Sequence, residues 1–120
     1  MKISNPTARL GENEACKFLK KLGYKILDRN FRVGYGEIDI VAIHENTLVF
    51  VEVKTRSSDK FGTPFEAITT WKLHPLIRTA QFYKQTHKNL PESMRIDAIA
   101  VKVSGNEVLD IEHIKNITGF

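Results

Sequence analysis

The alternation of apolar and polar residues divides the chain into seven predicted elements. Apolar residues recur at helical spacing in two stretches, and the other segments alternate with the period of two that strands show. We therefore expect one helix, three strands, a second helix and two closing strands. The predicted segments are 7–22, 24–32, 36–44, 47–56, 70–86, 95–103 and 107–114.

The first predicted helix has one apolar stripe and a glycine at its end. The stripe consists of Ala8, Ala15, Leu19 and Leu22, and Gly23 is placed to terminate the helix. We expect this stripe to face the core of the protein.

The second predicted helix contains a proline close to its start. Thr69 or Thr70 can cap it, but Pro75 has no backbone N–H, so we expect the regular helix to begin near His74 with the proline in its first turn. The residues on its buried side are Leu73, Leu76, Ile77, Ala80 and Tyr83.

Segments 36–44 and 47–56 are largely apolar on both faces, which is typical of central strands covered on two sides. This pattern predicts an α/β sandwich, with helices on both faces of a sheet. Strict alternation places Ile38 and Ile40 on the same face.

A two-residue turn at Glu45 and Asn46 would join these two strands and fix their register. His44 then opposes Thr47. The predicted pairs further along the strands include Asp39 with Glu52 and Glu37 with Lys54.

Composition narrows the class of protein without defining it. The 120 residues fit one domain, residues 1–120, and the start of the chain has no apolar run typical of a secretion signal or a membrane span. With one cysteine and hence no internal disulfide, we expect a cytoplasmic protein that has no contact with membranes. The formal charge of +4 permits binding to nucleic acid but does not require it.

The predicted pairing of Asp39 with Glu52 is unusual because directly opposed like charges repel each other. A cation between them would remove the repulsion. With Lys54 on the same face, the two carboxylates form the minimal arrangement for holding a divalent metal against a phosphate. A buried ion-pair network made from the same three residues is the alternative.

Glu12 lies close to the apolar stripe of the first helix, so we expect it to point inward and join this acidic pair. Taken alone, an acid near a helix start more often serves the helix dipole. Oxygen ligands of this kind suit magnesium or manganese. Four cations could contact phosphates, although each could equally be a solvated surface charge: Arg32, Arg56, Lys60 and Lys72.

Two levels of resemblance follow from these residues. Asp39 followed by Glu52-Val53-Lys54 resembles the PD-(D/E)xK signature of the restriction-endonuclease-like superfamily, with Ile38 in place of the proline. Six blocks that span nearly the whole chain resemble, in order, the YraN family of predicted bacterial endonucleases, which is related to archaeal Holliday junction resolvases. The blocks are "GENEA", "GYKILDRNFR", "GEIDIVA", "VFVEVKTR", "FGTPFEAI" and "RIDAIAV".

The resemblance implies a restriction-endonuclease-like α/β sandwich with a central mixed β-sheet flanked by helices. It further implies a magnesium-dependent or manganese-dependent endonuclease that acts on DNA, at branched or damaged structures. Asp39, Glu52 and the Val53 carbonyl would be metal ligands, Lys54 the catalytic lysine, and Glu12 the helix carboxylate, which could also ligate metal. Two alternatives stay open: a nucleic-acid-binding module that does not cleave on its own, and a structural domain with a charged core. Homodimerisation is also left open.

Overall fold

Helices and strands follow one another in the order that the hydrophobic pattern predicts. The structure, a computed structural model, describes residues 5–57 and 70–118. Neither of the helices in these ranges is long and apolar enough to cross a membrane. The elements are α1 (Pro6–Lys21), β1 (Lys25–Val33), β2 (Gly36–His44), β3 (Thr47–Arg56), α2 (Thr70–Thr86), β4 (Ser93–Ser104) and β5 (Glu107–Ile114).

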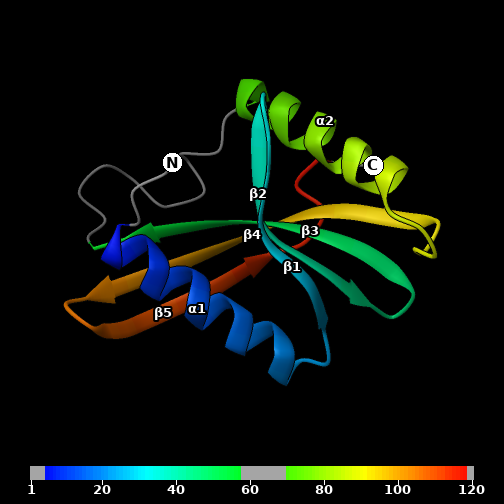
Figure 1. The fold of residues 1–120 in the computed structure, drawn as a ribbon. Coiled ribbons are helices and arrows are strands. Elements are labelled where there is room, and N and C mark those ends of the chain that lie inside the picture. Colours follow the sequence, from blue (N-terminus) through cyan, green and yellow to red (C-terminus); the bar gives the residue numbers. More distant parts are fainter. Residues whose placement is uncertain (1–4, 58–69, 119–120) are drawn as a thin grey trace.

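The five strands form one sheet in the order β1-β2-β3-β4-β5. β3 and β4 are parallel, and the other neighbouring pairs are antiparallel. α1 and α2 lie on opposite sides of this sheet, and the β1–β2 hairpin rises beside α2 (Figure 1). The predicted α/β sandwich with a central mixed sheet between helices is therefore confirmed.

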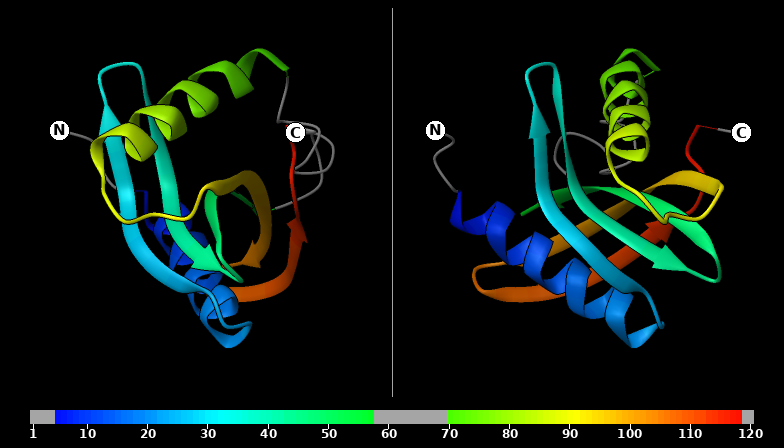
Figure 2. Two further views of the ribbon diagram at one scale, coloured as in Figure 1. Left: turned by 90° about the vertical axis from the view of Figure 1, so that its right-hand side faces the viewer. Right: turned by 45° about the vertical axis from the view of Figure 1, so that its right-hand side comes forward.

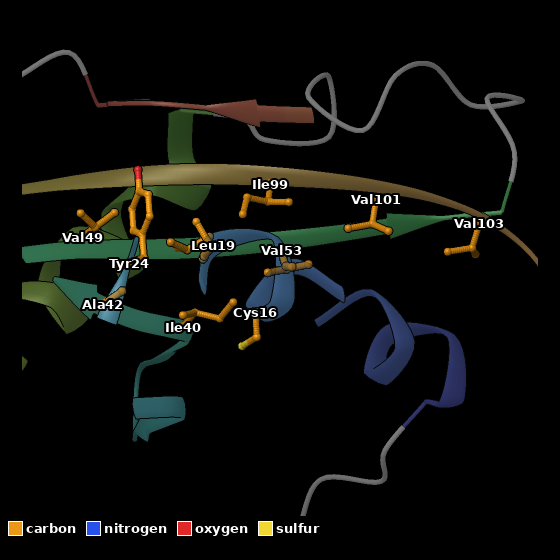
Figure 3. Close-up of a cluster of buried hydrophobic side chains, with 12 residues drawn as sticks. Cys16, Leu19, Tyr24, Ile40, Ala42, Val49, Val53, Ile99, Val101 and Val103 are labelled. Atoms are coloured by element: carbon orange, nitrogen blue, oxygen red, sulfur yellow. The ribbon is translucent and has the colours of Figure 1, made fainter. Parts of the chain in front are cut away.

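The first hydrophobic cluster fills the space between α1 and the sheet. Cys16 and Leu19 of α1 point toward Ile40, Val53 and Ile99 of the strands (Figure 3). The helix lies close to β3 at Gly11, where a Cβ atom would overlap the Thr55 hydroxyl group. Glycine at this position lets α1 lie directly against the end of β3.

The second hydrophobic cluster lies on the other side of the sheet, beneath α2. Leu76, Ala80 and Tyr83 of the helix pack against strand residues that include Phe50 and Ile96. Leu73 and Ile77 border the same cluster. The helical spacing therefore predicted the buried side of α2 correctly.

Several predictions about the helices are wrong in detail. α1 begins at Pro6, within one residue of the predicted start, and the Asn5 side chain caps it by accepting hydrogen bonds from the backbone N–H groups of Thr7 and Ala8. Leu22 is 51% exposed, since the helix ends at Lys21 and Leu22 is its C-cap residue, whose backbone is no longer helical. Pro75 lies inside α2 rather than in its first turn. A proline removes a single hydrogen bond there, and packing of the rest of the helix offsets that loss.

Candidate functional site

The β2–β3 hairpin has the turn and register that the sequence predicts. Glu45 and Asn46 have positive φ angles of 48° and 62°, as a tight two-residue hairpin turn requires. Backbone pairing runs from His44 with Thr47 to Ile40 with Val51. Asp39 is the next residue of β2 beyond this paired stretch.

The regular alternation of side chains along β2 is interrupted at Asp39. Ile40 packs in the cluster beneath α1, whereas Ile38 packs in the cluster beneath α2, so the prediction that both share one face is wrong. Opposite this point on β1, Asn30 has a φ of 54°, a left-handed conformation that interrupts regular alternation. The β1–β2 hairpin is strongly twisted, and its tip lies toward α2 (Figure 2).

The Asp39 carboxyl group is buried at this interruption, with an exposed fraction of 5%. Its Oδ2 atom accepts a hydrogen bond of 2.8 Å from the Val53 backbone N–H. A second hydrogen bond joins it to the Glu52 side chain. The predicted pair of opposed acids is therefore brought together through side chains rather than by backbone pairing.

These surroundings raise the pKa of Asp39 to about 8. Burial is the largest cause, followed by the hydrogen bond to Glu52 and the negative charges of Glu52 and Glu37, while the Val53 N–H acts in the opposite direction. A hydrogen bond between two carboxyl groups requires a proton on one of them. At neutral pH, the pair of carboxyl groups thus holds a proton, which these surroundings favour on Asp39.

A proton thus relieves the repulsion that the sequence predicted. Across residues 5–57 and 70–118, neither Asp39 nor Glu52 forms an ion pair with a lysine or arginine. Lys54, two residues beyond Glu52 on β3, is half-buried and likewise forms no ion pair in these ranges. This arrangement differs from a buried ion-pair network.

The backbone of Val53 adds a further oxygen atom on the same side. In an antiparallel pair, the N–H and C=O groups of one residue point toward the same neighbouring strand. Because the Val53 N–H reaches Asp39, its carbonyl also faces the β2 side. The Val53 side chain, in contrast, belongs to the cluster beneath α1.

Glu12 is not brought together with the other two acids. Its side chain is 16% exposed, and its Oε1 atom lies 4.0 Å from Arg29 Nη2. α1 covers the face of β3 that includes Val53, and alternation directs Glu52 to the opposite face. Within the described parts of the chain, no three Asp, Glu, His or Cys side chains lie close enough to hold one metal ion.

Arg29 is a residue of this region that the sequence did not single out. It donates a hydrogen bond of 2.8 Å to Asn13 Oδ1 and thereby links β1 to the helix turn that includes Glu12. A bulge between Ile26 and Asp28 shifts the register of β1. Because alternation cannot be counted through an unrecognised bulge, the direction of Arg29 could not be predicted from the sequence.

The predicted phosphate contacts lie in different environments. Arg32 is exposed and pairs with Glu37 of β2 at 3.0 Å. The backbone pairing of β2 with β3 ends at Ile40 and Val51, so Glu37 is not paired with Lys54 as predicted. Arg56 is half-buried at the end of β3. Lys60 and the side chain of Lys72 lie outside the described residues.

Fold and site together define an α/β protein whose five-stranded mixed sheet between two helices is consistent with a restriction-endonuclease-like fold. The chain belongs to the family described as uncharacterised protein family UPF0102, whose model matches residues 11–101.

Relatives in this family are similar over most of their length. A UPF0102 protein from Caldicellulosiruptor saccharolyticus is 53% identical over 107 residues, which cover 88% of this chain and 91% of the relative. A UPF0102 protein from Renibacterium salmoninarum is 40% identical over 117 residues, or 98% of this chain and 99% of the relative. Another, from Syntrophomonas wolfei, is 44% identical over 107 residues, with coverage of 88% and 91%.

Proposed function

We propose that this protein is a metal-dependent endonuclease that hydrolyses phosphodiester bonds in DNA, with branched or damaged structures as its expected substrates. The observation that supports this proposal most is the buried pair of Asp39 and Glu52. Two acids held in hydrogen-bonding contact, with no ion pair to a cation of residues 5–57 and 70–118, form a site where a metal ion can replace a proton.

The donor atoms of this site fit magnesium or manganese. Both ions prefer hard oxygen ligands, which Asp39, Glu52 and the Val53 carbonyl supply. When bound, such an ion would stabilise negative charge on the phosphate and lower the pKa of an attacking water molecule. Ion binding would also require Asp39 to lose its proton, which couples metal affinity to pH.

Lys54 is the proposed catalytic residue. Strand alternation directs it to the same face as Glu52, two residues along β3. From there its ammonium group would orient the attacking water, or stabilise the charge that develops on the phosphate as the bond breaks.

Glu12 would act at the edge of this site. Its contact with Arg29 holds it on the α1 side of the sheet, apart from an ion bound between Asp39 and Glu52. We therefore assign it to a second ion. Arg32, Arg56, Lys60 and Lys72 are the proposed contacts to DNA phosphates.

A second function, a nucleic-acid-binding module without cleavage activity of its own, is favoured by one observation. Glu12 is not assembled with Asp39 and Glu52, so the full carboxylate set of the proposed active site is not in place in the isolated chain. A binding partner would then be needed to complete it.

A cleavage assay under single-turnover conditions separates the two functions. Single-stranded, duplex, flap and four-way DNA are each incubated with saturating protein and with magnesium, manganese or a chelator. We expect metal-dependent cleavage by the parent and a rate at least about 100-fold lower for Lys54→Ala, the usual scale for a lost general base or charge stabiliser. Lys25→Ala, at an exposed position at the start of β1, is the control and should cleave like the parent.

Equal rates for the parent and Lys54→Ala would remove Lys54 from catalysis. If the parent binds DNA but cleaves none of the four structures, the binding module becomes the better description.

A further inference from the structure

Two large aromatic side chains lie exposed along the seam between β1 and α2. Tyr35, at the tip of the β1–β2 hairpin, is 41% exposed, and Phe82 of α2 is 39% exposed. The guanidinium carbon of Arg78 lies 4.2 Å from the centre of the Tyr35 ring. We refer to Tyr35, Arg78 and Phe82 as the seam surface.

The seam surface is held on rigid elements. The hairpin tip and α2 lie side by side (Figure 2), and a Cβ atom at Gly36 would come within 2.6 Å of Thr79 Oγ1. The Phe82 ring centre lies 6.4 Å from that of Phe31 on β1. Both ends of the seam surface are therefore fixed by contacts between the strand and the helix.

The core of the protein does not account for these exposed rings. The buried side of α2 includes Leu76, Ala80 and Tyr83, whereas Arg78 and Phe82, one helical turn apart, face outward. Outward-facing aromatic rings beside a guanidinium group form a platform on which flat, electron-rich groups can stack.

The distribution of charged side chains over the protein indicates the class of ligand. No Asp or Glu occurs in residues 67–91, and the exposed cations of the described part of this stretch are Arg78 and Lys88. At the opposite edge of the sheet, β5 has Glu107, Asp110 and Glu112 and no lysine or arginine. This difference in charge favours binding of a polyanion on the α2 side over the β5 edge.

We propose that the seam surface binds an unpaired stretch of nucleic acid, whose bases stack on Tyr35 and Phe82 and whose phosphates lie near Arg78 and Lys88. Bases within a duplex are stacked on each other and do not offer their faces to a protein ring, whereas unpaired bases do. The surface thus selects single-stranded regions.

The seam surface also lies close to the candidate metal site. Tyr35 precedes Asp39 by four residues, which corresponds to about 13 Å along an extended strand. One unpaired strand could therefore contact both. This last step rests on the proposed endonuclease function, whereas the binding surface itself does not.

Fluorescence anisotropy in the presence of a chelator tests the surface without cleavage. The probe is a labelled oligodeoxythymidine of about 16 nucleotides, the upper site size of one small nucleic-acid-binding fold. We expect Tyr35→Ala and Phe82→Ala each to weaken binding at least about fivefold, the lower end of the effect of losing one stacked base. Tyr35→Phe, which keeps the ring, should bind like the parent.

Leu109→Ala is the matched control, since Leu109 is 54% exposed but lies on the acidic β5 edge. It should bind the probe like the parent. A duplex of the same length should bind more weakly than the single strand and should not distinguish the alanine variants from the parent. Circular dichroism melting curves establish that each variant is folded.

Three results would overturn the proposal. The first is equal affinity of parent, Tyr35→Ala and Phe82→Ala for the single strand, and the second is ring-dependent binding of the duplex in preference to the single strand. The third is a parent dimer, detected by sedimentation, that the two alanine changes dissociate, because the seam would then be an interface between copies of the chain.

Failure of this proposal can be distinguished from failure of the proposed function. If cleavage occurs but the rings do not affect binding, the seam proposal alone is wrong. If the two rings determine binding but the parent cleaves no DNA, the proposed endonuclease function is wrong and the proposed binding surface is supported.

Discussion

Two aspartates are buried in the same sheet but have opposite surroundings. Asp97 of β4 is 0% exposed and Asp39 of β2 is 5% exposed. Asp97 accepts hydrogen bonds of 3.0 Å from Arg95 Nε and 2.8 Å from His113 Nε2. It also accepts one of 2.9 Å from the Asn116 backbone.

The pKa values of the two side chains move in opposite directions as a result. Burial alone would raise the pKa of Asp97, but hydrogen bonds from His113, the Asn116 backbone and Arg95 outweigh it, so the pKa lies below its ordinary value. At Asp39, burial and the neighbouring Glu52 act together and raise the pKa to about 8. Burial is similar at both sites, so the charge of the neighbours makes the difference.

This difference separates a structural acid from a candidate functional one. Asp97 is surrounded by donors that stabilise its charged form, so it links β4 to β5 and to the chain that follows. Asp39 is held where its charged form is unfavourable. Arrangements that cost stability in the unliganded protein are common at functional sites.

The largest predicted effect on stability comes from removing Asp97, the structural acid. Asp97→Ala leaves Arg95 and His113 without their buried partner, and we expect the free energy of unfolding to fall by about 3 to 5 kcal/mol. Urea denaturation at pH 7 measures this. A loss below about 1 kcal/mol would show that the network around Asp97 contributes little.

A substitution of Asp39, in contrast, should increase the free energy of unfolding. Asparagine retains the shape of protonated Asp39, can accept from the Val53 N–H and can donate to Glu52. In metal-free protein at about pH 9, we expect Asp39→Asn to raise the free energy of unfolding by about 1 kcal/mol or more, or about 4 °C in Tm. A clear fall in Tm would instead make Asp39 a structural residue like Asp97.

The pH dependence of stability should distinguish the two residues as well. Folded Asp39 keeps its proton up to a pKa of about 8, whereas the unfolded side chain loses it near 3.8, so the folded state binds more protons between these values. Stability should therefore decrease as the pH rises from about 4 to 8. Asp39→Asn should flatten this slope in thermal melts across the range.

The contribution of Asp97 to the pH dependence of stability has the opposite sign. Its lowered pKa stabilises the folded state above the pKa of the unfolded side chain, and this contribution is lost as the pH falls through the folded pKa. Asp97→Ala should therefore leave the slope between pH 4 and 8 in place. A flattened slope in this variant, with an unchanged one in Asp39→Asn, would reverse the assignment.

The smallest predicted effect on stability concerns Glu12. Its contact with Arg29 is long, at 4.0 Å, and the Arg29 side chain is 37% exposed, so the loss of this contact in Glu12→Gln should contribute less than about 1 kcal/mol to the free energy of unfolding. If Glu12 belongs to the active site, the same variant should nevertheless lose cleavage activity. Unchanged cleavage would remove it from the site.

The sequence predicted that Asp39 and Glu52 lie close together because this contact depends on local rules. A two-residue turn at Glu45 and Asn46 fixes the register of the hairpin, and this register directs Asp39 toward Glu52. Apolar patterning on both strand faces was enough to predict helices on each side of the sheet.

The remaining features depend on irregular backbone and on distant partners. The bulge in β1 and the left-handed Asn30 change which face the next residues occupy, and neither has a reliable signal in one sequence. Asp97 could not be recognised as a structural acid because His113 and Asn116 come from β5 and the segment after it.

Calorimetric titration of manganese at pH 7 tests most directly the central claim that Asp39 and Glu52 form a metal site. The parent is compared with Asp39→Asn, Glu52→Gln and the control Glu14→Gln. Each protein is titrated in two buffers of different ionisation enthalpy, so that proton release can be measured. Glu14 is a matched acid on α1 whose side chain pairs with Lys17 at 4.0 Å. We predict that the parent and Glu14→Gln bind the ion and release close to one proton, because the pKa of Asp39 is about 8. Asp39→Asn and Glu52→Gln should bind at least about tenfold more weakly, without that proton release. Equal affinity in all four proteins would show that Asp39 and Glu52 do not form a metal site.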